Sequence, residues 1–397
     1  MYVVSAISES LAKNRCTFLR LANFLVFLAG ACPVAFAQIE VLPADGIYSK
    51  LTRQFDRAVA EHQQRPLACH VEAIRPRLGY SFRFFSGFYA TIPARQLDTG
   101  KGNRLVAFFR VEAESGGGPH YFFHPLNVPE IPQDPGKVEL EAGGGFYVGD
   151  GNYSVDWILV DQKDRVCTRS WTVKTPKTKF ALLVPAGVIQ PLGLESWKGF
   201  NEKKTSEAKM TVFLSAMPIY RRRMLSKLPP YDLAILLSSL TTLLDSSKYT
   251  HARVVAFDLL SKRVLFEQDE FDPAGYKRLR DKLETQSYGT IDYQTLARGL
   301  TDRKLFEEIL KQETARSNKS DAVVFLGAEG APADKLPPVF AEYRQSLSRL
   351  YYVFFARFPQ PVQDIMYQFV HGGKGKVVNL FSPPDLVNAI RAIDSAN

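Results

Sequence analysis

The sequence predicts two folded domains, an all-β sandwich followed by a doubly wound α/β domain. Between residues 67 and 175, short segments rich in Val, Phe, Tyr and Trp follow one another without helices, separated by Gly, Pro, Asp and Asn clusters. From residue 207 onward, continuous apolar runs alternate with segments that repeat apolar residues at helical spacing. A parallel sheet covered by helices on both faces is the arrangement that this second pattern predicts.

The composition is that of an ordinary globular protein. Of 397 residues, 46% are hydrophobic and 23% are charged, so sizeable cores are expected and wholesale disorder is not. The length leaves room for two or three domains. The formal net charge of +9 is mild for this length, so it favours an acidic partner only weakly and predicts no nucleic-acid partner.

Residues 1–37 have the pattern of a signal peptide. Three basic residues precede the apolar stretch "LANFLVFLAGACPVAFA", which ends in small residues at the two positions that signal peptidase reads before Gln38. We therefore expect an exported protein, periplasmic or extracellular in the cell envelope, with no integral membrane span after cleavage. A retained N-terminal anchor and a lipoprotein attached at Cys32 are the alternatives.

Removal of this leader changes both the charge and the cysteine count. The leader carries three basic residues and one acidic residue, so its loss lowers the net charge from +9 to +7. Cys69 and Cys167 are the two cysteines that remain. In an oxidising compartment two such thiols predict a disulfide, and two buried free cysteines are the alternative.

Residues 38–66 are expected to form an N-terminal helical segment. Over residues 46–64, one stripe at helical spacing carries the apolar side chains Tyr48, Leu51, Phe55 and Val59. The predicted sandwich at 67–175 is immunoglobulin-like, with Cys69 near its first strand and Cys167 on its last. The glycines of "EAGGGFYVGDGN" are expected in a hairpin. Residues 176–206 are interpreted as a linker that is apolar at first and then polar.

Residues 207–397 are expected to form the α/β domain. "MTVFLSA" is an apolar run typical of a central strand buried on both faces. A leucine-rich helix follows Pro229-Pro230, and two strands flanking Leu260-Ser261-Lys262 form a hairpin. Helical sequence then leads to three further strands, "DAVVFLGAEG", "RLYYVFFARF" and "KVVNLFS", each followed by a helix. The expected sheet is thus parallel, with one antiparallel edge strand.

This order of elements resembles that of von Willebrand factor A (vWA) domains, over about half of the chain. The segment Gly289-Thr290-Ile291-Asp292-Tyr293 is similar to the turn that supplies a metal-coordinating threonine in that family. The layout, with a β-sandwich before the vWA-like domain, resembles vWA-related proteins of bacterial envelopes. The resemblance implies a protein-interaction module whose ligand edge is formed by the carboxyl ends of the strands.

The metal site of the family is degenerate in this sequence. The resemblance implies an Asp-x-Ser-x-Ser motif after the first strand and an aspartate after the fourth, because a hard divalent cation prefers oxygen ligands. Here the first strand ends in Ser215-Ala216-Met217, and Ala328 stands about where the second aspartate belongs. Thr290 alone matches, with Asp292 and Glu329 as neighbouring oxygens. We therefore expect no metal and no cofactor.

Three arginines stand beside the expected ligand edge. Arg221, Arg222 and Arg223 could replace the metal and bind acidic groups of a protein partner by bidentate hydrogen bonds, or they could form a solvated turn. The predicted partner-binding residues are Ser215, Met217, Arg221, Arg222, Arg223, Thr290, Asp292 and Glu329.

The resulting expectation is an exported, non-enzymatic module that binds a protein partner. An α/β hydrolase using Ser215 is one alternative, although Ser215 lacks a Gly-x-Ser-x-Gly elbow. His251 and His371 are its two candidate partners in this half of the chain, and His251 is expected at the wrong end of the sheet. A purely structural envelope component is the other alternative. His120 and His124 suggest no metal site, because no other metal-ligating residues join them.

Overall fold

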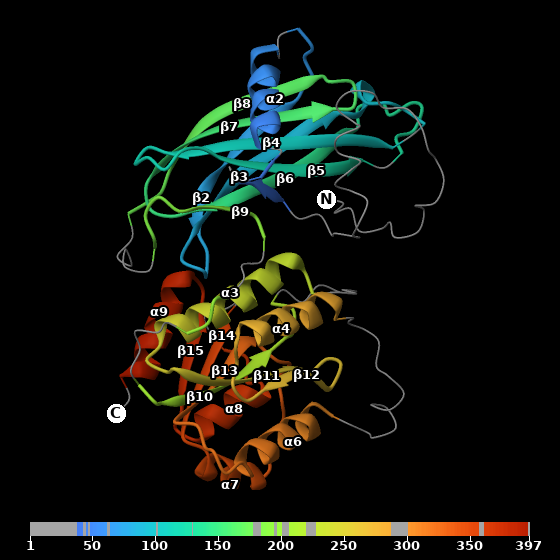
Figure 1. Ribbon diagram of the computed structural model, residues 1–397. Helices are drawn as coiled ribbons and strands as arrows, with labels where there is room; N and C mark the ends of the chain where they lie inside the picture. The colour runs from blue at the N-terminus through green and yellow to red at the C-terminus, as the bar shows by residue number, and fades with distance from the viewer. Residues whose placement is uncertain are drawn as a thin grey trace.

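The structure is a computed structural model that describes residues 38–42, 45–46, 48–61, 64–100, 102–128, 130–177, 184–193, 197–200, 206–219, 228–286, 301–356 and 361–395. Within these ranges the chain forms a β-rich part and an α/β part, which stand one above the other in Figure 1.

The β-rich part consists of two antiparallel sheets that pack face to face. One has the strand order β1-β5-β4-β7-β8 and the other β2-β3-β6-β9. Phe88 on β3 lies 4.8 Å from Trp157 on β7 and 5.4 Å from Phe109 on β4, measured between ring centroids, so aromatic rings fill the space between the sheets. The strands are β1 (Ile39–Val41), β2 (His70–Leu78), β3 (Phe84–Pro93), β4 (Asn103–Ala113), β5 (His120–Val128), β6 (Glu139–Val148), β7 (Asn152–Asp161), β8 (Val166–Lys174) and β9 (Ile189–Pro191), with a short 3-10 helix at Ala94–Gln96.

These sheets extend beyond residues 67–175 at both ends. β1 comes from the segment expected to be helical and pairs with β5, Glu40 opposite Phe122. β9 comes from the expected linker and pairs with β6. Each is three residues long, so its place in a sheet depends on these distant partners rather than on any local pattern.

The expected N-terminal helix is present as α2 (Tyr48–Glu61) and lies on the outer face of the five-stranded sheet. Phe55, from its apolar stripe, is buried against Ile158 and Val166 of that sheet. The predicted disulfide between Cys69 and Cys167 is confirmed, with the two Cα atoms 6.2 Å apart. Because Cys69 immediately precedes β2 and Cys167 lies on β8, the bond joins the two sheets.

The glycine run Gly143–Gly145 differs from expectation, because it lies inside β6 and not in a hairpin turn. A Cβ atom on Gly145 would stand 2.3 Å from the backbone oxygen of Ser86 on the paired strand β3. The absence of side chains thus permits a close approach of the two strands, which is the usual reason for glycine within a strand.

The α/β part is built on one six-stranded sheet with the order β12-β11-β10-β13-β14-β15. Only β12 is antiparallel to its neighbour. Numbered along the chain, this is the order 3-2-1-4-5-6 of doubly wound folds, with an antiparallel edge. The predicted sequence of strands is therefore confirmed. Their bounds are β10 (Lys209–Ser215), β11 (His251–Asp258), β12 (Arg263–Gln268), β13 (Ala322–Ala328), β14 (Arg349–Phe355) and β15 (Lys376–Leu380).

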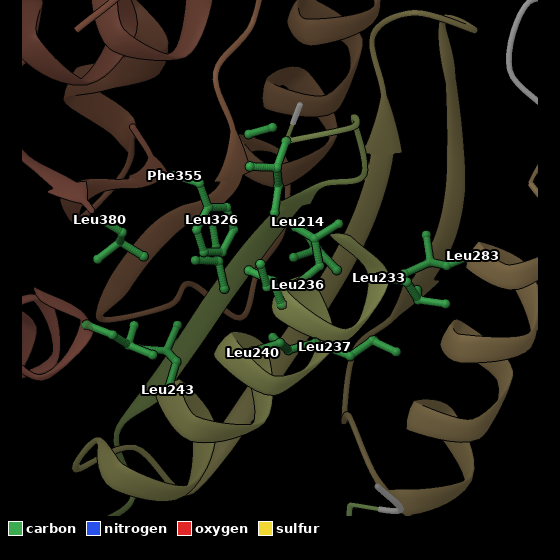
Figure 2. Packing of buried hydrophobic residues seen from close by; sticks show 14 of the residues in the cluster. Leu214, Leu233, Leu236, Leu237, Leu240, Leu243, Leu283, Leu326, Phe355 and Leu380 are labelled. Atoms are coloured by element: carbon green, nitrogen blue, oxygen red, sulfur yellow. The ribbon is translucent and has the colours of Figure 1, made fainter. Parts of the chain in front are cut away.

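Helices cover both faces of this sheet. α3, α4 and α9 lie on the face toward the β-rich part, and α6, α7 and α8 lie on the other (Figure 1). Figure 2 shows the leucines of α3 packed against Leu214 of β10 and Leu326 of β13. None of the helices in the described ranges is both long and apolar enough to cross a membrane. The bounds are α3 (Pro230–Ser246), α4 (Pro273–Thr285), α6 (Asp302–Thr314), α7 (Val339–Ser346), α8 (Ile365–Gly372) and α9 (Pro383–Asp394).

The turn between β2 and β3 connects the two parts. The Tyr80 ring packs edge-on against Phe355 at the carboxyl end of β14, with centroids 5.3 Å apart. The Thr242 hydroxyl of α3 donates a hydrogen bond of 2.8 Å to the Tyr80 carbonyl. On the linker side, the Trp197 indole donates to Asp245 of α3 at 2.8 Å. The β-rich part thus docks on the face of the sheet that α3 covers.

Candidate functional site

The strand order places the candidate site at the carboxyl edge of the sheet, between β10 and β13. The chain leaves β10 toward β11 on one side, whereas β13 begins the other half of the sheet, and ligands of open α/β folds bind in the crevice at such a switch point. Ser215 and Gly327 are the last register partners of this strand pair. The site residues predicted from the sequence at the ends of β10 and β13 belong to this edge.

Ser215 and Met217 lie beneath this edge rather than on its surface. Both side chains are buried, Ser215 at 0% and Met217 at 1% exposure. The Ser215 hydroxyl is 3.4 Å from the Ala328 carbonyl, to which it donates. The Ser215 hydroxyl thus joins the end of β10 to the end of β13.

The close approach of the two strands depends on Gly327. Its φ is +143°, a region that side-chain-bearing residues rarely adopt, and a Cβ atom there would stand 2.4 Å from the Ser215 carbonyl oxygen. At the switch point, the backbone of Gly327 thus packs directly against the backbone of Ser215, with no space for a side chain between them.

We expect Gly327→Ala to lower the free energy of unfolding by about 3 kcal/mol, because the new methyl group is both strained at this φ and in conflict with β10. Urea denaturation measures the change. Gly193→Ala is the control, since a Cβ atom there meets nothing within 4 Å, and it should leave the midpoint unchanged. Equal midpoints for the two variants would contradict the packing described here.

The two residues after Gly327 are Ala328, which has no carboxylate, and Glu329, whose carboxylate is engaged in a hydrogen bond. Ala328, which stands where the vWA pattern has an aspartate, is 1% exposed. Glu329 accepts a hydrogen bond of 3.0 Å from the backbone N–H of Val362, in the segment that precedes α8. The Glu329 carboxylate therefore orders a neighbouring loop.

Three buried aspartates that sequence reasoning missed surround the same edge. Asp232, in the first turn of α3, accepts from the backbone N–H of Ile219 at 2.8 Å. Asp258, the last residue of β11, accepts from the backbone N–H of Leu260 at 2.9 Å and from the Ser261 hydroxyl. These carboxylates hold the loops after β10 and β11 in place.

Asp364, the third of these aspartates, caps α8. It accepts hydrogen bonds from the Tyr352 hydroxyl at 2.6 Å, and from the backbone N–H groups of Gly330 and Tyr367 at 2.5 and 2.7 Å. Burial raises the pKa of Asp364 above its ordinary value, although these hydrogen bonds favour the charged form. The sequence signal was an aspartate directly before the apolar run "IMYQFV", which is typical of a helix N-cap.

The remaining predicted site residues lie outside the described residues. These are Arg221, Arg222, Arg223, Thr290 and Asp292. Among the residues that are described, no group of three or more His, Cys, Asp and Glu side chains is arranged to hold a metal ion.

The histidines in this half of the chain lie away from Ser215. His251 pairs with Lys209 at the start of β11, six residues before the partner of Ser215 in the register, and its ring contacts Glu270 at 3.1 Å. His371 stacks on Tyr367 near the end of α8. In the β-rich part, His120 lies 2.9 Å from Glu40, and burial lowers the pKa of His124.

Exposed apolar side chains mark the surface of the carboxyl edge. In the described part of the α/β domain four large hydrophobic side chains are exposed, and the turns and helix start that carry them lie at the edge formed by the carboxyl ends of the parallel strands. Tyr231 begins α3, Leu260 and Val264 flank the β11–β12 turn, and Phe381 follows β15. Their exposed fractions are 65% for Tyr231, 44% for Leu260, 37% for Val264 and 55% for Phe381.

Comparison with known proteins gives weak similarities only. No family model and no curated protein matches the chain. Among solved structures, BatB from Bacteroides thetaiotaomicron is 13% identical, with 47% of this chain and 94% of BatB covered and a TM-score of 0.28. A von Willebrand factor type A protein from Catenulispora acidiphila is 9% identical, with 75% of this chain and 51% of that chain covered and a TM-score of 0.26.

Proposed function

We propose that this protein is an exported, non-enzymatic module that binds a protein partner through the carboxyl edge of a vWA-like domain. The observation that carries the proposal is the position of the four exposed apolar side chains, Tyr231, Leu260, Val264 and Phe381, around that one edge. Large apolar and aromatic side chains are enriched in the cores of protein interfaces, so their presence along one edge makes that edge the candidate interaction surface.

The size of the edge favours a macromolecular partner. From β12 to β15 the sheet spans five strand spacings, or about 24 Å. Leu260 and Val264 lie near one end of this span and Phe381 follows the strand at the other. A ligand that contacts both ends must therefore span about 24 Å. This is the width of a standard protein interface, which buries about 800 Å² on each partner.

The vWA-like assignment rests on the strand order, with its antiparallel edge strand next to β11. For the β-rich part, the immunoglobulin-like assignment stays a prediction. Two packed antiparallel sheets joined by a disulfide are compatible with it. Export is supported by the leader-like residues 1–37 and by a disulfide of the kind found in oxidising compartments.

Leu260→Asp should weaken partner binding at least tenfold, because a charge placed in an apolar contact loses hydration without gaining a partner. The partner is first captured from envelope extract with the wild-type protein, and its affinity for each variant is then measured by surface plasmon resonance. Val138→Asp is the matched control, because Val138 is also exposed, at 57%, but lies in the β-rich part. Undiminished binding by the Leu260 variant would contradict the proposed surface.

Reversal of Arg221, Arg222 and Arg223 to glutamate should slow association with an acidic partner and invert its salt dependence, because the glutamates repel that partner and salt screens the repulsion. Association rates at 50 and 300 mM NaCl measure this. A variant whose rate falls with salt as the wild-type rate does would contradict a role of the arginines in binding.

A further inference from the structure

Gln38, where the described residues begin, connects the two sheets of the β-rich part. It directly precedes β1, which belongs to the five-stranded sheet, and it is 9% exposed. Its side-chain Oε1 atom accepts a hydrogen bond of 2.5 Å from the backbone N–H of Leu192. Leu192 directly follows β9 of the four-stranded sheet. The side chain of Gln38 therefore joins one sheet to the other.

This connection lies at the edge of the sandwich opposite to the disulfide. β1 and β9 are end strands of their sheets and contact each other, whereas β8 and β2 are the end strands on the other side. The bond between Cys69 and Cys167 joins that other side. The hydrogen bond from Leu192 to Gln38 is its non-covalent counterpart. Gln38 thus has a defined place in the fold.

The amide of Gln38 is satisfied at its oxygen and not at its nitrogen. The Nε2 atom is buried and, within the described ranges, has no hydrogen-bond partner. The orientation of the amide follows from Leu192, because a backbone N–H can donate to Oε1 and not to Nε2. A buried donor without an acceptor is rare in native proteins, so this atom requires an explanation.

The chemistry of an N-terminal glutamine supplies one. Cleavage of the leader after Ala37 leaves Gln38 with a free α-amine. This amine and the side-chain amide carbon belong to one residue, so they can react intramolecularly to form the five-membered lactam pyroglutamate. A bond forms between the backbone nitrogen and Cδ, the bond between Cδ and Nε2 breaks, and Nε2 leaves as ammonia with a proton from the amine. The reaction consumes no oxidant, reductant or other reactant.

Cyclisation retains the atom of Gln38 that has a partner and removes the atom that has none. The former Oε1 becomes the lactam oxygen and remains an acceptor for the Leu192 N–H group. The Nε2 donor is lost. Ring closure also replaces the charged α-ammonium group by a neutral amide, which is less costly to place beside a buried side chain. Each of these changes favours the cyclised residue in the folded protein.

We propose that Gln38 is the first residue of the mature protein and is modified to pyroglutamate, which the edge formed by β1 and β9 then holds. The proposal rests on the export proposed above. Because Gln38 is buried once β1 has paired, the ring closes before this edge forms, and the folded protein afterwards protects it. The cyclised residue has no α-amine, so it offers aminopeptidases no point of attack.

Mass spectrometry of the N-terminal tryptic peptide tests the proposal. The full-length chain is expressed in a bacterial host that exports it, and the mature protein is purified and digested. The peptide QIEVLPADGIYSK, residues 38–50, should have the mass of its sequence less one ammonia. A synthetic peptide of the same sequence with an uncyclised glutamine, carried through the same steps, is the control for ring closure during preparation. The intact protein should resist Edman degradation.

Protection of the lactam by the fold is a second readout. Pyroglutamyl peptidase, which removes an N-terminal pyroglutamate, should act about tenfold faster on Leu192→Pro than on Leu192→Ala, because the population of the open edge rises when a hydrogen bond is lost. The two variants both lack the leucine side chain, and only the proline variant also lacks the N–H group that holds the lactam.

Four results would overturn the proposal, and they are distinguishable. An unmodified Gln38 at the N-terminus, or a loss of ammonia no greater than in the control peptide, would exclude the modification and leave the proposed export intact. A chain that begins at Met1 or Cys32 would contradict cleavage before Gln38. Equal release from the two Leu192 variants would exclude a role of the edge formed by β1 and β9. Partner binding at the carboxyl edge is measured separately and is affected by none of these results.

Discussion

Replacement of both Cys69 and Cys167 by alanine should lower the free energy of unfolding of the β-rich part by about 4–5 kcal/mol. The bond closes a segment with a sequence separation of 98 residues, and the chain entropy that such a cross-link removes from the unfolded state corresponds to about 4.7 kcal/mol for a loop of this size. No other covalent link joins β2 to β8 among the described residues, so nothing compensates for the loss of this one.

Guanidinium denaturation followed by tryptophan fluorescence measures this loss, since Trp157 and Trp171 lie on β7 and β8. Wild-type protein treated with dithiothreitol should unfold at the same denaturant concentration as the double alanine variant. The α/β part has no disulfide in its described residues, so reductant should leave its own transition in place. An oxidised wild type that is no more stable than the variant would contradict the prediction.

The α/β fold could be predicted because its local signals agree with its tertiary structure. β10 and β13 are buried on both faces, so each appears in the sequence as an unbroken apolar run. The leucines of α3 repeat at helical spacing because one face of that helix covers the sheet. Burial in the core requires apolar residues at these positions, so the sequence itself shows the apolar runs of the strands and the leucine spacing of the helix.

The edge strands are harder to predict for the converse reason. The sequence indicates the nine-residue β2 only as a first strand near Cys69, because Pro76, four charged or histidine side chains and the exposure of much of the strand leave no clean alternation. β1 and β9 have three residues each and are fixed only by pairing with β5 and β6. Pairings between segments far apart along the chain leave no periodic pattern in so short a strand.

The candidate site was predictable as a location and not as a set of contacts. The end of β10 and the missing carboxylate at Ala328 could be read from the sequence, because both depend on strand order. The roles of Asp232 and Asp258 could not be read from the sequence, because the residue type is the same whether an aspartate orders a loop or faces a ligand. Asp364 differs, because its place before an apolar run is typical of a helix N-cap. The burial of Ser215 likewise follows from Gly327, whose φ the sequence does not reveal.

Arg253→Met should lower the free energy of unfolding by about 3–5 kcal/mol, because it leaves a buried carboxylate without its cation. Arg253 on β11 is 6% exposed and donates to Glu313 of α6 at 2.9 Å. Its other guanidinium nitrogens contact Glu267 at 2.8 Å and Asp269 at 2.9 Å. Glu313 is 4% exposed, so its charge has little access to water once Arg253 is removed.

A second variant separates the loss of the ion pair from the cost of the orphaned charge. Arg253→Met/Glu313→Leu removes both buried charges, so it should be more stable than Arg253→Met alone. Thr211 loses an acceptor in the double variant but keeps the Ser320 hydroxyl at 2.7 Å. A double variant that is less stable than the single one would mean that most of the lost stability comes from the ion pair itself and not from the burial of an unpaired carboxylate.

The same arginine should influence acid unfolding. Hydrogen bonding and charge from Arg316, together with Arg253, lower the pKa of Asp269 below its ordinary value of 3.8. A carboxyl group whose pKa is lowered by folding stabilises the native state above its unfolded pKa, and this contribution is lost as the pH falls through the folded value. Without Arg253 the pKa of Asp269 rises toward 3.8, so the acid-unfolding midpoint should move to higher pH. Titration of the wild type and the variant from pH 7 to pH 2, followed by circular dichroism, measures the shift, and coincident midpoints would contradict it.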